Sequence, residues 1–128
     1  MILKENDPRL DSIISEIESE LSSQDWRQNF SLDIEPDWNE NDDIIGLQIK
    51  VECNVDWTDR EGRHPWMEKS VTVDFENMTI KGEATLESKD GRISESADDE
   101  STFTELTQVA DFVVDMLQEM EYEMDNNC

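Results

Sequence analysis

Carboxylates are the side chains of this sequence whose number and spacing suggest chemistry. Thirty-four Asp and Glu stand against ten Lys and Arg in 128 residues, a formal net charge of −24 at pH 7. Near the C-terminus four acids recur at every fourth position, Asp111, Asp115, Glu119 and Glu123. A helix would place these four in one stripe. Carboxylates can bind a hard cation, transfer a proton or attract a cationic surface, and each of these requires different neighbours.

The strongest metal pattern is incomplete. The spacing Asp37-x-Asn39-x-Asn41 matches the first three ligand positions of a calcium loop. The sixth position of such a loop is Gly and the twelfth is Glu, but this chain has Asp42 and Gln48 there. No group of Cys and His has the spacing of a zinc site. We therefore expect neither a metal nor another cofactor.

Catalysis is not expected either. The one histidine, His64, has no nucleophile pattern near it. The sequence contains no glycine-rich phosphate loop and no nucleophile elbow. Pairs of carboxylates are so frequent in this chain that their presence does not indicate acid–base chemistry. We predict a protein that is not an enzyme.

The net charge restricts the partners. Solubility of a small domain needs a net charge of only about 2–8 in magnitude. Direct binding to nucleic acid or to an anionic membrane is disfavoured because both are negative. The N-terminal residues lack the apolar run of a signal peptide, and two cysteines, Cys53 and Cys128, do not make a disulfide framework. We expect a cytoplasmic protein that binds no membrane.

The elements that position these charges are organised around residues 45–57. Apolar residues occupy every second position there, which predicts a strand with one buried face. They are Ile45, Leu47, Ile49, Val51, Cys53, Val55 and Trp57. Shorter alternations predict further strands over residues 30–38, 71–75 and 78–86. The stretch 60–69, where Arg60, Arg63, His64 and Lys69 gather, is expected to be a loop, as is the acidic stretch 93–100.

A helix is predicted at each end of the chain. Asp7 is a suitable N-cap with Pro8 at the first helical position, and an apolar stripe follows from Leu10 to Leu21. Thr102 and Glu105 fit a capping box ahead of a second stripe, from Leu106 to Met124. The predicted fold is a single α+β domain, residues 1–128. It is a two-layer sandwich in which both helices cover one face of a four-stranded antiparallel meander, in the order α-β-β-β-β-α.

This fold leaves the other face of the sheet to the acids. Glu52, Asp74 and Glu83 are predicted on that outer face. Trp38 and Trp57 have the parity of the core and are expected to be buried. Trp66 is either an exposed anchor for a partner or folds back onto the sheet. The candidate partner-binding residues are therefore these three acids, Trp66 and the helical stripe, namely Asp111, Asp115, Glu119 and Glu123.

The predicted function is inhibition of a basic, nucleic-acid-binding protein through a surface that imitates the charge of DNA or RNA. In size and charge the chain resembles small acidic inhibitors of phages and mobile elements, of the anti-restriction or anti-CRISPR type. It similarly resembles immunity proteins and antitoxins that neutralise basic nuclease toxins, which is the first alternative. A halophile domain of unrelated function is the second. The sequence leaves the oligomeric state open, monomer and homodimer alike.

Overall fold

The computed structural model describes residues 7–22, 28–55, 58, 60–88 and 94–126. The side chains of residues 22, 28–30, 94–95 and 121–126 lie outside this description. Two helices, a 3-10 turn and five strands make up the described part. They are α1 (Pro8–Ser22), β1 (Gln28–Trp38), β2 (Ile44–Asn54), β3 (Trp66–Asp74), β4 (Thr79–Glu87), β5 (Ser94–Thr102), η1 (Leu106–Gln108) and α2 (Val109–Asn126).

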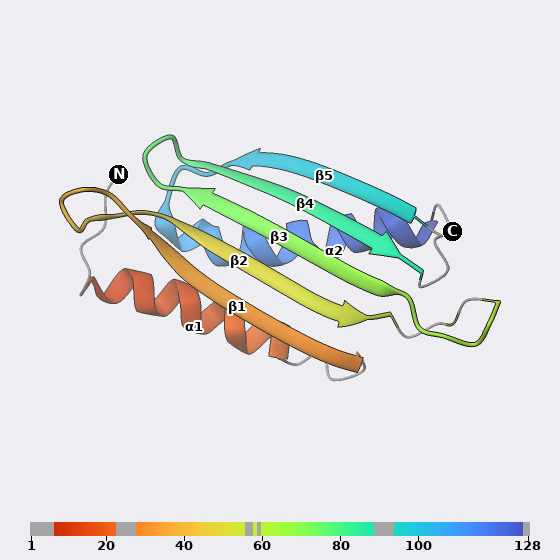
Figure 1. Cartoon of the computed structure of the whole chain (residues 1–128). Coiled ribbons are helices and arrows are strands. Elements are labelled where there is room, and N and C mark those ends of the chain that lie inside the picture. Colours follow the sequence, from red (N-terminus) through yellow and green to blue (C-terminus); the bar gives the residue numbers. More distant parts are fainter. Residues whose placement is uncertain (1–6, 23–27, 56–57, 59, 89–93, 127–128) are drawn as a thin grey trace.

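The strands form one antiparallel sheet whose spatial order, β1-β2-β3-β4-β5, is the order of the chain. Both helices lie on the same face of this sheet, α1 beside β1 and β2 and α2 behind β3, β4 and β5 (Figure 1). The predicted α+β class, the meander and the helices on one face are confirmed. None of the described helices combines the length and the apolar run needed to cross a bilayer.

The predicted number of strands is wrong, because the sheet has five. Residues 94–102, most of which were expected to be an acidic loop, pair with β4 along its whole length as β5. The sequence Ser94 to Thr102 contains one apolar residue, Ala97, opposite Ala84. A strand at a sheet edge can form because its neighbour offers an unpaired row of N–H and C=O groups. Its own side chains then need no alternation.

The core forms where the alternating residues of the sheet meet the two helix stripes. Leu47, Ile49, Val51, Cys53 and Val55 are all at most 2% exposed, as their parity predicts. The described residues of both helix stripes are buried as well, apart from a partly exposed Ile14. Asp7 caps α1 as expected, since its carboxylate oxygen accepts the N–H of Arg9 at 2.9 Å. Trp57 and Met124 lie outside the described part of the chain.

Two local predictions are corrected. Trp38 is 44% exposed rather than buried, because it is the last residue of the edge strand β1, where it lies opposite Ile44 and has no strand on its other side. Thr102 does not begin a capping box, because it pairs with Thr79 in the sheet. The helical segment begins later, where the side-chain oxygen of Gln108 accepts the backbone N–H groups of Thr104 and Glu105.

Two glycines permit close approaches, of different kinds. A Cβ at Gly46 would lie 2.4 Å from the backbone oxygen of Val73 on β3. A Cβ at Gly82 would lie 2.8 Å from the sulfur of Met116 and 2.9 Å from the terminal carbon of Met120, both on α2. Backbone atoms within a sheet cannot move aside cheaply, whereas the ends of methionine side chains can. Gly82 therefore lets α2 pack closely on β4, while Gly46 is required by the sheet itself.

We predict that Gly46→Ala destabilises the fold more than Gly82→Ala. The first should lower the free energy of unfolding by about 1–3 kcal/mol, as overpacking does. The second should cost less, because Met116 and Met120 can change rotamer. Chemical denaturation of both variants measures the difference, with Thr85→Ala on the exposed face as the control. Equal losses for the two glycines would contradict the distinction.

Candidate partner-binding surface

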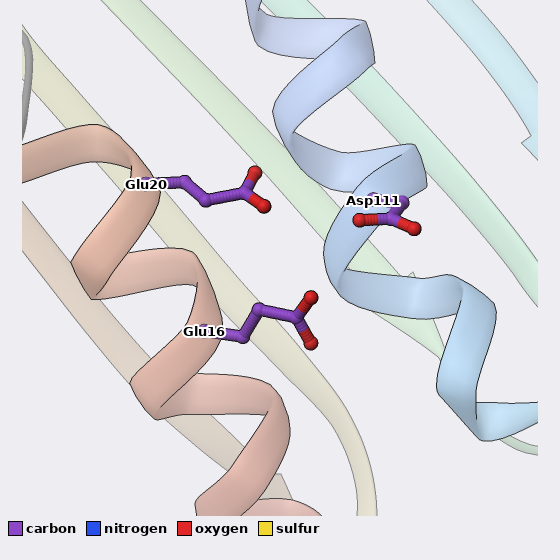
Figure 2. A group of neighbouring side chains, drawn as sticks. All are labelled: Glu16, Glu20 and Asp111. Carbon is purple, nitrogen blue, oxygen red and sulfur yellow. The ribbon is translucent and has the colours of Figure 1, made fainter.

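The acidic stripe of α2 does not face a single neighbour. Asp111 lies across from α1, where Glu16 and Glu20 point toward α2 (Figure 2). Asp115 and Glu119 line a groove between α2 and β5. The main chain of Glu123 is helical, but its side chain lies outside the described part. The stripe is therefore divided between the α1 side and the β5 side of the helix.

Glu16, Glu20 and Asp111 bring three exposed carboxylates together, with one oxygen of each within 4.8 Å of one oxygen of the others. Oxygen is the ligand type that hard divalent cations prefer, but Ca²⁺ takes six to eight such ligands. Acid clusters at a surface arise without a metal in a chain of this charge. The partial calcium pattern is also accounted for, because the side-chain oxygen of Asn39 accepts the N–H groups of Asn41 and Asp43 within the β1–β2 turn.

A second grouping of acids surrounds β5. On the helix side, an open groove of about 700 Å³ is lined by Asp99, Glu100, Asp115 and Glu119, together with Phe112 and Met116. On the opposite side of the sheet, a smaller hollow of about 390 Å³ is lined by Glu83, Asp98, Asp99 and Glu100, with Lys81. The two hollows share Asp99 and Glu100 and so meet across the edge strand.

We name the acids of both hollows the β5 acidic edge: Glu83, Asp98, Asp99, Glu100, Asp115 and Glu119. They come from β4, β5 and α2, and all are exposed or half-exposed. None of them forms an ion pair with another described residue. The site has negative charge on both sides of one strand, reduced on the outer side by Lys81, which lies opposite Glu100 in the register. Phe112 and Met116 add apolar atoms to the groove on the helix side.

Glu52, one of the acids predicted on the outer face of the sheet, is ion-paired, unlike the acids of the β5 acidic edge. Lys50 binds Glu52 at 3.0 Å and Glu68 on the neighbouring strand at 3.4 Å. The hydrogen bond that Lys50 donates to Glu52 raises the pKa of Lys50 most, followed by the negative charge of Glu52 and by the hydrogen bond and charge of Glu68. The charge of Glu52 is therefore partly compensated inside the molecule. Glu83, by contrast, lies opposite Asp98 in the β4–β5 register and belongs to the β5 acidic edge.

Asp74 has a structural role in the turn between β3 and β4. Its carboxylate accepts the side-chain N–H of Asn77 at 2.8 Å and the backbone N–H groups of Glu76 and Asn77. These hydrogen bonds, that of the Asn77 side chain foremost, hold the pKa of Asp74 below its usual 3.8. The turn also contains Met78 at a φ of 56°. The sequence suggested Asp74 only as a surface charge.

The expected basic loop does not form one cationic patch. Trp66 to Lys69 belong to β3. Lys69 is only 3% exposed, and its ammonium group donates to the backbone oxygen of Leu117 on α2 at 3.3 Å. Arg63 pairs with Glu61. Trp66 is 38% exposed and lies opposite Asn54 and Glu87, so it belongs to the outer face of the sheet.

Comparison of this chain with protein-family models, with curated proteins and with solved structures found no match. Its function must therefore be inferred from its own surface. Three acids of that surface, Asp98, Asp99 and Glu100, were not among the predicted site residues. Their signal in the sequence was the absence of Lys and Arg after Arg92. The pairing of β5 with β4 then brought them to the side of α2.

We predict that the pKa of Asp74, followed by NMR titration of its carboxyl carbon, lies below 3.8. A lowered folded-state pKa means that this carboxylate stabilises the fold above its unfolded pKa. The contribution is lost as the pH falls through the folded pKa. Asn77→Ala should raise the pKa of Asp74, because the first of its stabilising hydrogen bonds is removed. A titration unchanged by Asn77→Ala would show that the Asn77 side chain does not stabilise the carboxylate.

We predict that Glu16→Gln stabilises the protein. The change removes repulsion from Glu20 and Asp111, and like charges in such positions cost a few tenths of a kcal/mol, or about 1–2 °C in the melting temperature. Glu18→Gln, on the same helix but outside the cluster, is the control. The difference between the two should vanish in about 1 M salt, where the Debye length is about 3 Å. If Glu16→Gln remained more stabilising than Glu18→Gln in high salt, charge repulsion would not be the cause.

Proposed function

We propose that this protein is a non-enzymatic inhibitor of a nucleic-acid-binding protein, and that the β5 acidic edge takes the place of nucleic-acid phosphates. The observation that carries the proposal is the gathering of six acids from β4, β5 and α2 around two connected hollows, without an ion pair to any described residue. Restriction or CRISPR machinery is the proposed target class, and the cytoplasm is the proposed compartment. We propose no direct binding to nucleic acid or membrane.

The spacing of the acids supports this proposal. Asp115 and Glu119 are separated by about 6 Å along the axis of α2. Asp98 and Glu100 lie on one face of β5, about 7 Å apart along the strand. Both separations are comparable with the distance between successive phosphates of a nucleic-acid strand. A basic groove that accepts phosphates would find carboxylates at similar intervals here.

The way in which the acids are held also supports it. They lie on a paired strand and on a packed helix, so little conformational freedom remains to be lost on binding. A surface of one sign accelerates the encounter with a partner of the opposite sign. For this reason a charge-based interface should be recognisable by its effect on the association rate.

The experiment uses a variant in which Asp98, Glu100, Asp115 and Glu119 are changed to Asn or Gln. A protein captured from host lysate is purified and its binding measured. We predict that the association rate falls at least about tenfold, with a smaller change in dissociation. The matched control neutralises four acids elsewhere, namely Glu18, Asp33, Glu35 and Glu87. Competition with duplex DNA at two salt concentrations must show mutually exclusive binding.

The immunity-type alternative has its own observation, the 38% exposed Trp66 on the outer sheet face. Buried aromatic anchors carry much of the energy of such interfaces. If Trp66→Ala weakens binding more than the four neutralisations, and if the partner binds DNA and this protein together, the mimic function is wrong. The immunity-type function would then take its place. Unfolding below about 1 M KCl would instead identify an adaptation to salt.

A further inference from the structure

The free edge of β5 carries backbone groups available for pairing. The Phe103 N–H donates to the Met78 oxygen, one residue beyond the pair Thr79–Thr102. Hydrogen-bonded pairs alternate along an antiparallel ladder, so the N–H groups of Ala97, Asp99 and Ser101 face β4. Those of Ser96, Asp98 and Glu100 therefore face away from the sheet. No further strand pairs with them, because β5 is the last strand of the described sheet. The Glu100 N–H donates to the side-chain oxygen of Asp99 at 2.9 Å, so the outward donors open to a new strand are those of Ser96 and Asp98.

The opposite edge of the sheet is interrupted by a proline. In β1 the same reasoning, from the Phe75 N–H to Ile45 oxygen bond, directs the backbone nitrogens of Leu32, Ile34 and Pro36 outward. Proline has no N–H to offer and is a common means of protecting an edge. The residues of β5 include no proline, so its protection is its charge.

That charge lies on both sides of the free edge. The side chains of Asp98 and Glu100 are exposed on the outer face of the sheet. Asp99 lies on the helix side, where Asp115 and Glu119 line the same groove. A strand added to β5 would thus have carboxylates along both of its faces. A second copy of β5 would bring acids against acids, which disfavours self-pairing.

We infer that the free edge of β5 binds an extended, lysine- and arginine-rich segment of the partner, which adds to the sheet as a sixth strand. Its backbone pairs with Ser96 and Asp98, and its cationic side chains alternate between the two hollows. In the groove on the helix side, Phe112 and Met116 supply apolar atoms for the aliphatic part of such side chains. This inference rests on the proposed function, because it specifies which element of a basic partner is held.

The test uses a synthetic nine-residue peptide in which pairs of arginines alternate with pairs of threonines, so that arginines lie on both faces of the extended strand. The control peptide has the same sequence with every backbone amide N-methylated, which keeps the charge and removes the donors. Strand addition predicts that N-methylation weakens binding to the wild-type protein at least about tenfold, because several backbone hydrogen bonds are lost. Equal binding of the two peptides, or no binding of the unmethylated one, would overturn the inference.

A variant of the protein tests the same edge without changing its charge. Ser96→Pro removes an outward N–H and leaves the hydrogen bonds to β4 in place. It should weaken binding of the peptide about tenfold, whereas Ser96→Ala should not. Should Ser96→Pro not fold, hydrogen exchange of the wild-type protein decides. Addition of the peptide should then slow exchange of the Ser96 and Asp98 amides, but not of Leu32 and Ile34 on the other edge.

These experiments separate the inference from the proposed function. Peptide binding that is insensitive to N-methylation refutes strand addition. It does not affect the test of the proposed function, in which DNA and this protein compete for the captured partner. Conversely, a partner that binds DNA and this protein together refutes the proposed function whatever the peptide does. Slowed exchange confined to β1, or spread evenly over both edges, would also overturn the assignment of β5 as the docking strand.

Discussion

The stability of this fold depends on the packing of two apolar helix stripes against one face of the sheet. A net charge of −24 opposes any compact state, and the ion pairs on the outer sheet face, Lys50 with Glu52 and Glu68, are largely exposed. Such pairs contribute about 0–1 kcal/mol each. Full burial of a large apolar side chain such as Phe75 or Leu117 contributes about 1.5–3 kcal/mol. The folded state is therefore stabilised mainly by the packing of the helices on the sheet. The charged side chains lie on the surfaces that take no part in this packing.

The separation between core and charge explains where acids can accumulate. Strands β2 to β4 must keep one face apolar, since that face lies under the helices. The only apolar residue that β5 contributes to this layer is Ala97, which lies opposite Ala84 of β4. Gly82 of β4 lies opposite Asp99. Small side chains let α2 approach closely. The same approach brings Asp115 and Glu119 to the side of β5, so core packing and the acidic groove have a common cause.

The positions of Lys69 and Lys50 also follow from the division of the sheet into a helix-covered face and an exposed face. Lys69 has the parity of the core and lies under α2, where it binds the carbonyl oxygen of Leu117. Lys50 compensates Glu52 and Glu68 at the centre of the exposed sheet face. These cations are used within the molecule, whereas the acids of the β5 acidic edge form no ion pair with a described residue. The two edges of the sheet consequently differ: Pro36 protects β1, whereas acids protect β5.

The sequence by itself determined those helices and strands whose apolar residues recur with the period of the element and so mark its buried face. The alternation around Ile49 and Val51, the stripes of α1 and α2, and the cap at Asp7 each reflect a local rule, so each could be predicted. Only the tertiary structure decided that residues 94–102 form a strand, because that state depends on the hydrogen-bonding edge of β4. It also placed Asp98, Asp99 and Glu100 beside Asp115 and Glu119, exposed Trp38 and buried Lys69. These outcomes depend on register and on contacts between distant segments, which no local pattern encodes.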